Sequence, residues 1–257
     1  AALETRYDTK LFDRTGRRIT LTDTGRLFLE EAKAVSARAS AAELMLADLA
    51  GLKRGELRVA ASQTVGNYWL PQFIYSFRQK FPGVVVSLTI GNTATVTASM
   101  RDGAVNLGFV EGEIETAGLS VMPVADDEMI LVAPAGHPWG GRRRSRKLDL
   151  GAAAWIVREA GSGTRAVLDG FLARNNHSAG NLAHALVLPT NESVLTAVEA
   201  GFGVTVISKM AALAALRAKT IVRVGCRIPP RRFYMLRHVG RYVTSVEREF
   251  VHLVQPS

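Results

Sequence analysis

One stretch, residues 22–49, constrains the fold more than any other part of the chain. Small and apolar residues recur there at alternating steps of four and three, namely Phe28, Ala32, Val35, Ala39, Ala42, Leu46 and Leu49. This spacing predicts one long helix with a narrow apolar seam of about three heptads. Thr22 suits the N-cap of that helix. A partner helix normally covers such a seam, so we expect a dimer; the alternative is a helix that lies along its own domain.

A basic hairpin is predicted immediately before this helix. Residues 10–14 and 18–21 are short alternating runs of apolar and polar residues, separated by Thr15-Gly16-Arg17. Two such runs around a glycine-containing turn are typical of a β-hairpin. Its tip carries the cations Arg14, Arg17 and Arg18. Cations at such a tip suit contacts with nucleic-acid phosphates, which supply affinity rather than base identity.

The N-terminal motifs resemble those of the LysR-type transcriptional regulators. The resemblance is carried by Ala2-Leu3-Glu4, then Leu11-Phe12-Asp13-Arg14-Thr15-Gly16-Arg17, then Leu21-Thr22-Asp23-Thr24-Gly25. It implies the end of a recognition helix, a wing and the start of a linker helix, with the earlier helices of the winged helix-turn-helix lacking. Residues 1–21 would then be a remnant of the DNA-binding domain, residues 22–50 the linker and dimerisation helix, and residues 55–257 the effector-binding domain. Arg14, Thr15, Arg17 and Arg18 would contact double-stranded promoter DNA, and the protein would be a homodimer or homotetramer.

Composition narrows the class of protein. The 257 residues are 47% hydrophobic and 21% charged, which is ordinary for a globular protein. No apolar run approaches the roughly 20 residues of a membrane span, and no secretory leader is recognisable, so we expect a cytoplasmic protein away from membranes. The single cysteine, Cys226, excludes an internal disulfide and is expected to be a buried or half-buried filler. The net charge of +9 fits nucleic acid or anionic ligands as partners.

Strands and helices alternate after the linker, which predicts a parallel α/β sheet. We expect strands at 56–61, 84–90, 105–110, 155–157, 185–188, 204–208 and 233–238. We expect helices at 65–81, 94–102, 165–175, 193–200 and 244–253, and a helix start at 148–150. The long extended passage at 119–133 suggests a crossing into a second lobe. The family resemblance implies a two-lobed effector domain like periplasmic solute-binding proteins, with lobe I at about 55–126 and 228–257 and lobe II at about 127–227.

Polar residues follow the ends of the predicted strands, where α/β sheets bind ligands. Ser62, Gln63 and Thr64 follow the first strand, and Asn92 and Thr93 follow the second. Side chains of these types also cap helices routinely, and both roles can coexist. We therefore expect these five residues to contact an effector, to cap the helices that follow, or to do both.

The sharpest candidate site is the loop at 158–165. Gly161 and Gly163 allow a close approach of the backbone, Ser162 and Thr164 supply hydroxyl groups, and the following helix start attracts anions. Arg158 or Arg165 could neutralise a carboxylate, sulfate or phosphate. The alternative is a plain capped turn. The loop resembles that of family members linked to carbon fixation or sulfur metabolism, which points to a small anionic effector, and the resemblance also implies that Asn191 and Glu192 border the same cleft.

Catalysis is poorly supported. The five histidines show no metal-ligand spacing, and no nucleophile elbow, Walker A loop or dinucleotide fingerprint occurs, so we expect no catalytic residue, no metal and no cofactor. Asp126-Asp127-Glu128 is interpreted as a solvated hinge face, and the basic run at 142–147 as a solvated loop or a phosphate contact. The sequence thus predicts a DNA-binding regulator that responds to a small anionic metabolite. The alternative is the solute-binding module of a transport system.

Overall fold

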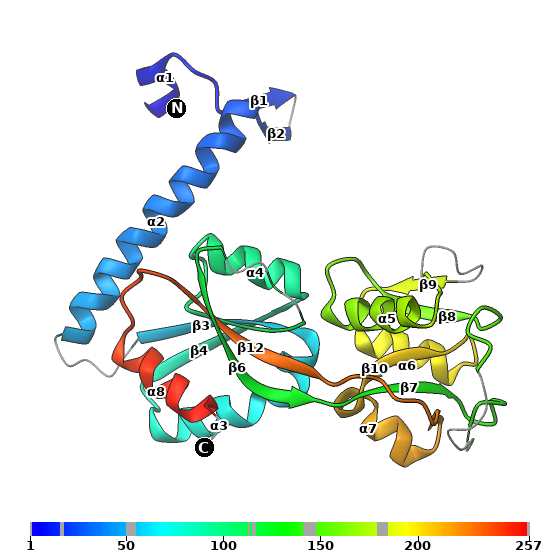
Figure 1. The fold of residues 1–257 in the computed structure, drawn as a ribbon. Helices are drawn as coiled ribbons and strands as arrows, with labels where there is room; N and C mark the ends of the chain where they lie inside the picture. Colours follow the sequence, from blue (N-terminus) through cyan, green and yellow to red (C-terminus); the bar gives the residue numbers. More distant parts are fainter. Residues whose placement is uncertain are drawn as a thin grey trace.

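The computed structural model describes residues 2–15, 18–49, 55–112, 114, 117–140, 148–178 and 185–255. Figure 1 shows a long N-terminal helix that projects from a body of two α/β lobes. The N-terminal part comprises α1 (Ala2–Tyr7), β1 (Phe12–Thr15), β2 (Arg18–Leu21) and α2 (Asp23–Leu49). Strands β1 and β2 pair antiparallel, as the hairpin pattern predicts.

Short polar contacts fix the start of α2 against the hairpin. The hydroxyl of Thr22 accepts a hydrogen bond from the N–H of Gly25 at 2.9 Å, which confirms the predicted cap. A Cβ on Gly25 would lie 2.0 Å from the carbonyl oxygen of Leu11, so only glycine fits there. The Glu4 carboxylate accepts the N–H groups of Leu11 and Phe12, and these hydrogen bonds lower its pKa to about 2. Local chemistry therefore sets the junction of hairpin and helix.

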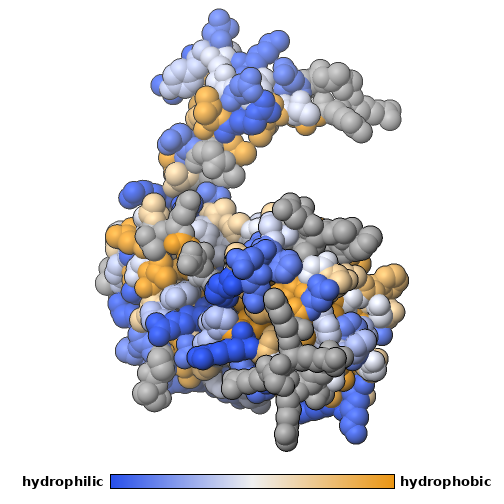
Figure 2. Space-filling view, turned by 45° about the vertical axis from the view of Figure 1, so that its right-hand side comes forward, coloured by the Kyte–Doolittle hydropathy of each residue, from blue (hydrophilic) through white to orange (hydrophobic). Residues whose placement is uncertain are grey.

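The apolar seam of α2 is exposed in the chain on its own. Figure 1 shows α2 extending away from both lobes rather than along either of them. Phe28 and Leu46 are exposed, and Val35 is 70% exposed. Hydrophobic side chains are visible on the surface of this projecting part in Figure 2. None of the described helices combines the length and the apolar character needed to cross a membrane.

Lobe I is built on a five-stranded sheet in the order β4-β3-β5-β12-β6. The strands are β3 (Gly55–Ser62), β4 (Val84–Gly91), β5 (Leu107–Glu111), β6 (Leu119–Asp127) and β12 (Arg231–His238). Strand β3 runs parallel to β4 and β5, whereas β12 runs antiparallel to β5 and β6. The sheet is therefore mixed, because β12 returns from lobe II in the opposite direction, and the predicted parallel arrangement holds only for the first three strands.

The helices of lobe I are α3 (Pro71–Lys80), α4 (Thr93–Arg101) and α8 (Ser245–Val254), with a short π-helix, η1 (Val65–Trp69), before α3. The single helix predicted at 65–81 is wrong, because the chain changes from η1 to α3 at Pro71. Proline has no N–H group to donate, so it favours the start of a new helix. Trp69, Phe77, Phe109, Phe233 and Phe250 fill the core between sheet and helices.

Lobe II contains two small sheets. Strand β7 (Met129–Pro134) lies between β10 (Thr205–Ser208) and β11 (Ile221–Arg223), and β8 (Trp155–Arg158) pairs parallel with β9 (Ala185–Leu188). The helices are α5 (Gly163–Arg174), α6 (Asn191–Glu199) and α7 (Lys209–Ala218). The fully buried Trp155 centres one core cluster, and the half-buried Cys226 packs at its edge.

The structure corrects the expectation of a helix start at 148–150. These residues are irregular, and the carboxylate of Asp149 accepts the N–H of Ala152 at 3.2 Å in a local turn. An aspartate bonded in this way offers the backbone an alternative to a helix. Helix α7 and strand β11 were not predicted.

Two segments cross between the lobes, one from β6 to β7 and one from residue 224 into β12. They pair at the crossing, where Arg231 lies opposite Asp127. The interpretation of Asp126-Asp127-Glu128 as a solvated face is wrong for Asp127, which is 0% exposed and bonded to Arg231 and Ser208. Its neighbours are at the surface, where hydrogen bonding to Lys209 lowers the pKa of Glu128.

Candidate functional site

Four turns that lead from a strand into a helix meet where the two lobes touch. They carry Ser62 and Thr64 after β3, Asn92 after β4, Ser162 after β8 and Thr190 after β9. Asn92, Ser162 and Thr190 cap α4, α5 and α6 with their side-chain oxygens. The capping role considered for Asn92 and Ser162 is therefore confirmed. Several helix N-termini are directed at one place, and this arrangement favours negative charge.

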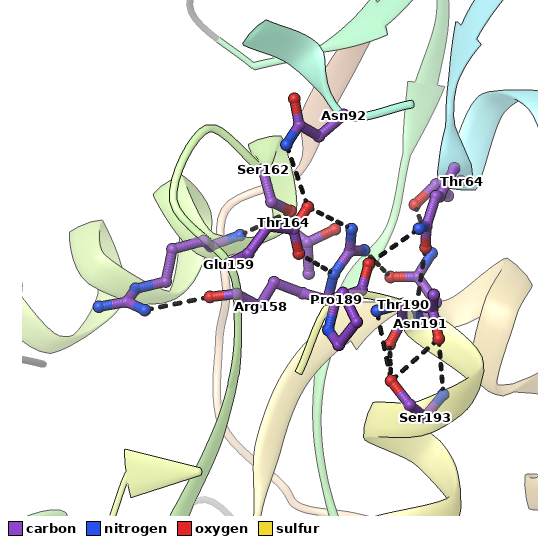
Figure 3. Close-up of polar contacts among 12 residues, drawn as sticks. Thr64, Asn92, Arg158, Glu159, Ser162, Thr164, Pro189, Thr190, Asn191 and Ser193 are labelled. Atoms are coloured by element: carbon purple, nitrogen blue, oxygen red, sulfur yellow. Dashed lines mark hydrogen bonds and ion pairs between the residues drawn. The ribbon is translucent and has the colours of Figure 1, made fainter. Parts of the chain in front are cut away.

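Arg158 lies at the centre of this meeting point and is 3% exposed. Its Nε and Nη2 donate to the two oxygens of Glu159 at 2.8 and 2.9 Å, and its Nη1 donates to Asn191 at 2.6 Å. Asn191 in turn donates to the hydroxyl of Thr64 at 3.1 Å. Figure 3 shows these side chains converging from both lobes. Arg158 therefore already binds a carboxylate of the chain itself, although it was expected to bind that of an effector.

Arg231 is the second buried arginine, and it was not among the residues predicted to lie in the site. It pairs with Asp127 at 2.8 Å and with Glu111 at 3.3 Å. It also donates to the hydroxyls of Thr64 and Thr164, each at 3.1 Å. Thr64 belongs to lobe I and Thr164 to lobe II, so the hydrogen bonds of Arg231 connect the two lobes. We call the set Ser62, Thr64, Glu111, Asp127, Arg158, Glu159, Thr164, Asn191 and Arg231 the lobe junction.

Two buried polar atoms of the lobe junction lack hydrogen-bond partners among the described residues. They are Ser62 Oγ and Glu111 Oε2. Burial raises the pKa of Glu111, and the charge of Arg231 opposes that rise. Leaving a buried polar atom unpaired costs about 1–3 kcal/mol, so such atoms usually mark a place where a further group binds.

Gln63 and Glu192 link the lobes on one side of the junction. The Gln63 amide donates to the carbonyl of Pro189 and accepts from the N–H of Asn191, each at 2.9 Å. One Glu192 oxygen accepts from Asn67 at 3.2 Å and from Tyr68 at 2.8 Å. Burial, followed by this hydrogen bond, raises the pKa of Tyr68. Both residues therefore make contacts between the lobes in this structure.

A pocket of about 1190 Å³ opens between α4 and α5, next to the lobe junction. Its walls include a subset of the residues predicted to bind the effector, namely Thr93, Gly161, Ser162, Gly163 and Arg165. Among the described residues, its lining includes five arginines, Arg101, Arg165, Arg174, Arg231 and Arg232, and one carboxylate, that of Asp169. Arg165 pairs with that carboxylate at 2.8 Å and donates to the carbonyl of Arg158 at 3.1 Å. The described lining is therefore basic, although Arg165, Arg231 and Arg232 are each paired with a carboxylate.

The predicted effector residues thus fall into two adjoining groups. Thr93, Gly161, Ser162, Gly163 and Arg165 line the α4–α5 pocket. Ser62, Gln63, Thr64, Asn92, Arg158, Thr164, Asn191 and Glu192 lie in or beside the lobe junction. The carboxylates Glu111 and Asp127 and the arginine Arg231 were missed. The sequence features that could have pointed to them are the Arg231-Arg232 pair and the acidic run at 126–128. The sequence does not reveal that these two features lie opposite each other on paired strands.

The structure describes only some of the residues that are predicted to contact DNA. Arg14, Thr15 and Arg18 lie on the paired strands β1 and β2, and only their backbone is described. Arg17 and the basic run at 142–147 lie outside the described residues. Among the described residues, no group of three or more histidine, cysteine or acidic side chains is placed to hold a metal ion.

Comparison with protein families identifies the larger part of the chain. Residues 50–257 match the LysR substrate binding domain. The chain is 35% identical over 212 residues to a probable RuBisCO transcriptional regulator of Trichormus variabilis, which covers 81% of this chain and 63% of that protein. It is 32% identical over 207 residues to the HTH-type transcriptional regulator CysL of Bacillus subtilis, with coverages of 80% and 68%. The chain thus spans somewhat less than two thirds of the first of these relatives.

A relative that also covers the hairpin and α2 is the uncharacterised HTH-type transcriptional regulator YeiE of Escherichia coli, 30% identical over 257 residues, or 99% of this chain and 85% of that protein. Among solved structures, the Synechocystis CcmR regulatory domain in complex with 2-PG superposes with a TM-score of 0.70 at 26% identity, covering 78% of this chain and 96% of that one. Full-length CbnR complexed with its target DNA gives a TM-score of 0.71 at 23% identity over 98% of this chain and 86% of that one, a likeness of fold alone. The chain belongs to the LysR family, a family of transcriptional regulators rather than of enzymes.

Proposed function

We propose that this protein is a DNA-binding transcriptional regulator whose lobe junction binds a small anionic metabolite. Promoter DNA is contacted by the hairpin, through Arg14, Thr15, Arg17 and Arg18. The similarity to YeiE over 99% of the chain supports this function over a transport module, because it includes the hairpin and α2 as well as the lobes. The solved CbnR complex supports the fold as one compatible with bound DNA.

Ser62 is the observation that carries the effector site. Ser62 is 1% exposed and lies at the end of β3 where the lobes meet, and its buried hydroxyl has no hydrogen-bond partner among the described residues. A hydroxyl that is buried at this cost and makes no internal bond is placed to donate to a ligand. The helix N-termini that converge on the same place favour an anion as that ligand.

The chemistry around the junction supports a small anion. Among the described residues, the adjoining pocket is lined by five arginines and one aspartate, and a basic lining attracts anions toward the junction. The CcmR regulatory domain, which shares the fold at 26% identity, was solved with 2-PG. The exposed seam of α2 is the proposed dimer contact, and through α2 a change at the junction reaches the DNA-binding hairpin.

Ser62→Ala tests the effector site directly. The substitution breaks no hydrogen bond to the described residues, so the free energy of unfolding of the unliganded protein is expected to stay equal or to rise. Affinity for a bound anion is expected to fall about tenfold, because a hydrogen bond to a charged ligand is lost. Isothermal titration with 2-PG, sulfate and inorganic phosphate measures the affinity, and urea unfolding measures the stability.

Ser76→Ala is the matched control. The Ser76 hydroxyl lies on the exposed side of α3 and donates within its own helix to Gln72. This variant is expected to bind every anion as the wild type does. Equal affinity of the Ser62→Ala variant and the wild type would contradict the assignment of the lobe junction as the effector site.

A further inference from the structure

We propose that Glu159 competes with the effector for Arg158. The Glu159 carboxylate is bound to the Arg158 guanidinium, and an effector anion displaces this carboxylate when it binds. This inference rests on the proposed effector site at the lobe junction. It adds a specific residue and a specific exchange to that site, and it limits the effector to anions that present two oxygens to one edge of a guanidinium.

The pairing of Glu159 with Arg158 has the geometry of a bound ligand. The two carboxylate oxygens accept from Nε and Nη2 of the guanidinium at 2.8 and 2.9 Å. This two-point contact is the one that arginine makes with carboxylate, sulfate and phosphate groups in general. Figure 3 shows Glu159 in this position between Arg158 and Asn92. The edge of the guanidinium that would recognise an effector anion is therefore already occupied.

The two partners differ in how firmly they are held. The Arg158 side chain is 3% exposed and is anchored by a separate bond from Nη1 to Asn191. The Glu159 side chain is 26% exposed, so it can turn toward solvent while the arginine stays in place. A buried guanidinium without a counter-charge is costly, whereas replacement of one anion by another keeps the charge balance. Exchange is thus favoured over simple opening of the pair.

Competition from Glu159 sets a minimum affinity that an anion needs in order to bind Arg158. Because Glu159 follows Arg158 directly in the chain, its carboxylate is present at a high effective concentration. A free anion must outcompete this tethered carboxylate, so the protein responds only to an anion that also gains contacts elsewhere. The unpaired hydroxyl of Ser62 and the helix N-termini of the junction supply such contacts.

The exchange also changes how the lobes are linked. One Glu159 oxygen accepts a hydrogen bond from the Asn92 amide of lobe I at 3.2 Å, so Glu159 on Arg158 ties lobe II to the start of α4. When an anion displaces Glu159, this link is released or passes to the anion. Glu199, an exposed carboxylate on α6 outside the lobe junction, accepts instead from the neutral hydroxyl of Thr220. It therefore offers a matched control.

The test compares Glu159→Gln with Glu199→Gln and the wild type in the full protein. Glutamine keeps the shape and an acceptor for Asn92 while removing the competing charge. Thermal unfolding is followed as sulfate or 2-PG replaces chloride at constant ionic strength, and the concentration dependence of the midpoint gives the affinity. Glu159→Gln is expected to bind at least one of these anions about tenfold more tightly than the wild type, the size of an ordinary coupling between sites. Glu199→Gln is expected to match the wild type.

The outcomes separate this inference from the effector site itself. If the wild type and Glu159→Gln bind sulfate and 2-PG equally and Ser62→Ala binds them more weakly, the effector site stands and the competitor role is wrong. If neither protein gains stability in either anion, both are wrong. Glu159→Asp gives a second measure, since a shorter carboxylate fits the guanidinium edge less well and should also strengthen anion binding, to a smaller extent.

Discussion

At the scale of single residues, the neighbours Arg231 and Arg232 show how environment decides what a charge contributes. Arg231 is buried between two carboxylates and two hydroxyls of the lobe junction. Arg232 is 63% exposed and meets Asp126 only at 3.5 Å on the surface. Surface ion pairs contribute about 0–1 kcal/mol, whereas removal of one partner from a buried pair leaves an uncompensated charge inside the protein.

Arg231→Ala is accordingly expected to lower the free energy of unfolding by about 3–5 kcal/mol. It strands Asp127 and Glu111 in the interior without their cation. Arg232→Ala, one position away, is expected to change the free energy of unfolding by less than about 0.5 kcal/mol. Urea unfolding of both variants makes the comparison, and similar losses for the two would show that Arg231 does not hold the junction together.

The sequence places residues well where local chemistry decides and poorly where distant pairing decides. The polar residues after strands, such as Ser62 and Asn92, could be selected because strand ends and turns are readable from local pattern. Glu111, Asp127 and Arg231 could not, because the contact of Asp127 with Arg231 joins positions 104 residues apart. Arg158 was assigned to a ligand for a different reason: side chains of successive residues in a strand normally point to opposite faces, so its pairing with the adjacent Glu159 was not expected.

At the scale of elements, α2 is the one that the sequence predicts best. Its start at the Thr22 cap follows from local pattern, and its 27 residues run to Leu49. Prediction fails where a single proline splits the helix at 65–81, where Asp149 stabilises a turn instead of a helix, and at α7 and β11. In the first two cases a competing local structure decides the outcome.

The exposed seam of α2 predicts a defined effect of charge. Val35→Glu places a carboxylate in the seam, where burial against a partner helix without a cation costs about 3 kcal/mol. The proposed dimer is expected to dissociate about 100-fold more readily, and binding to double-stranded DNA is expected to weaken with it. Ala34→Glu puts the same charge on an exposed position outside the seam and is expected to leave both properties unchanged. Sedimentation and gel-shift titrations measure them, and an equally stable Val35→Glu dimer would exclude the seam as the contact.

At the scale of the whole molecule, the two lobes are joined by two crossing segments and by the lobe junction. Arg231, Gln63, Glu159 and Glu192 each connect one lobe to the other. A ligand that binds among them alters these contacts, and α2 leads from lobe I to the hairpin (Figure 1). A coupling of about 1–3 kcal/mol between junction and DNA suffices for regulation.

A crystal structure of the protein grown with saturating sulfate or 2-PG tests the central claim most directly. We expect this structure to show an anion within about 3 Å of Ser62 Oγ. The anion is bound to Nε and Nη2 of Arg158, and Glu159 is turned away from that guanidinium. A structure in which Glu159 still holds Arg158 while the anion lies outside the lobe junction would contradict the account.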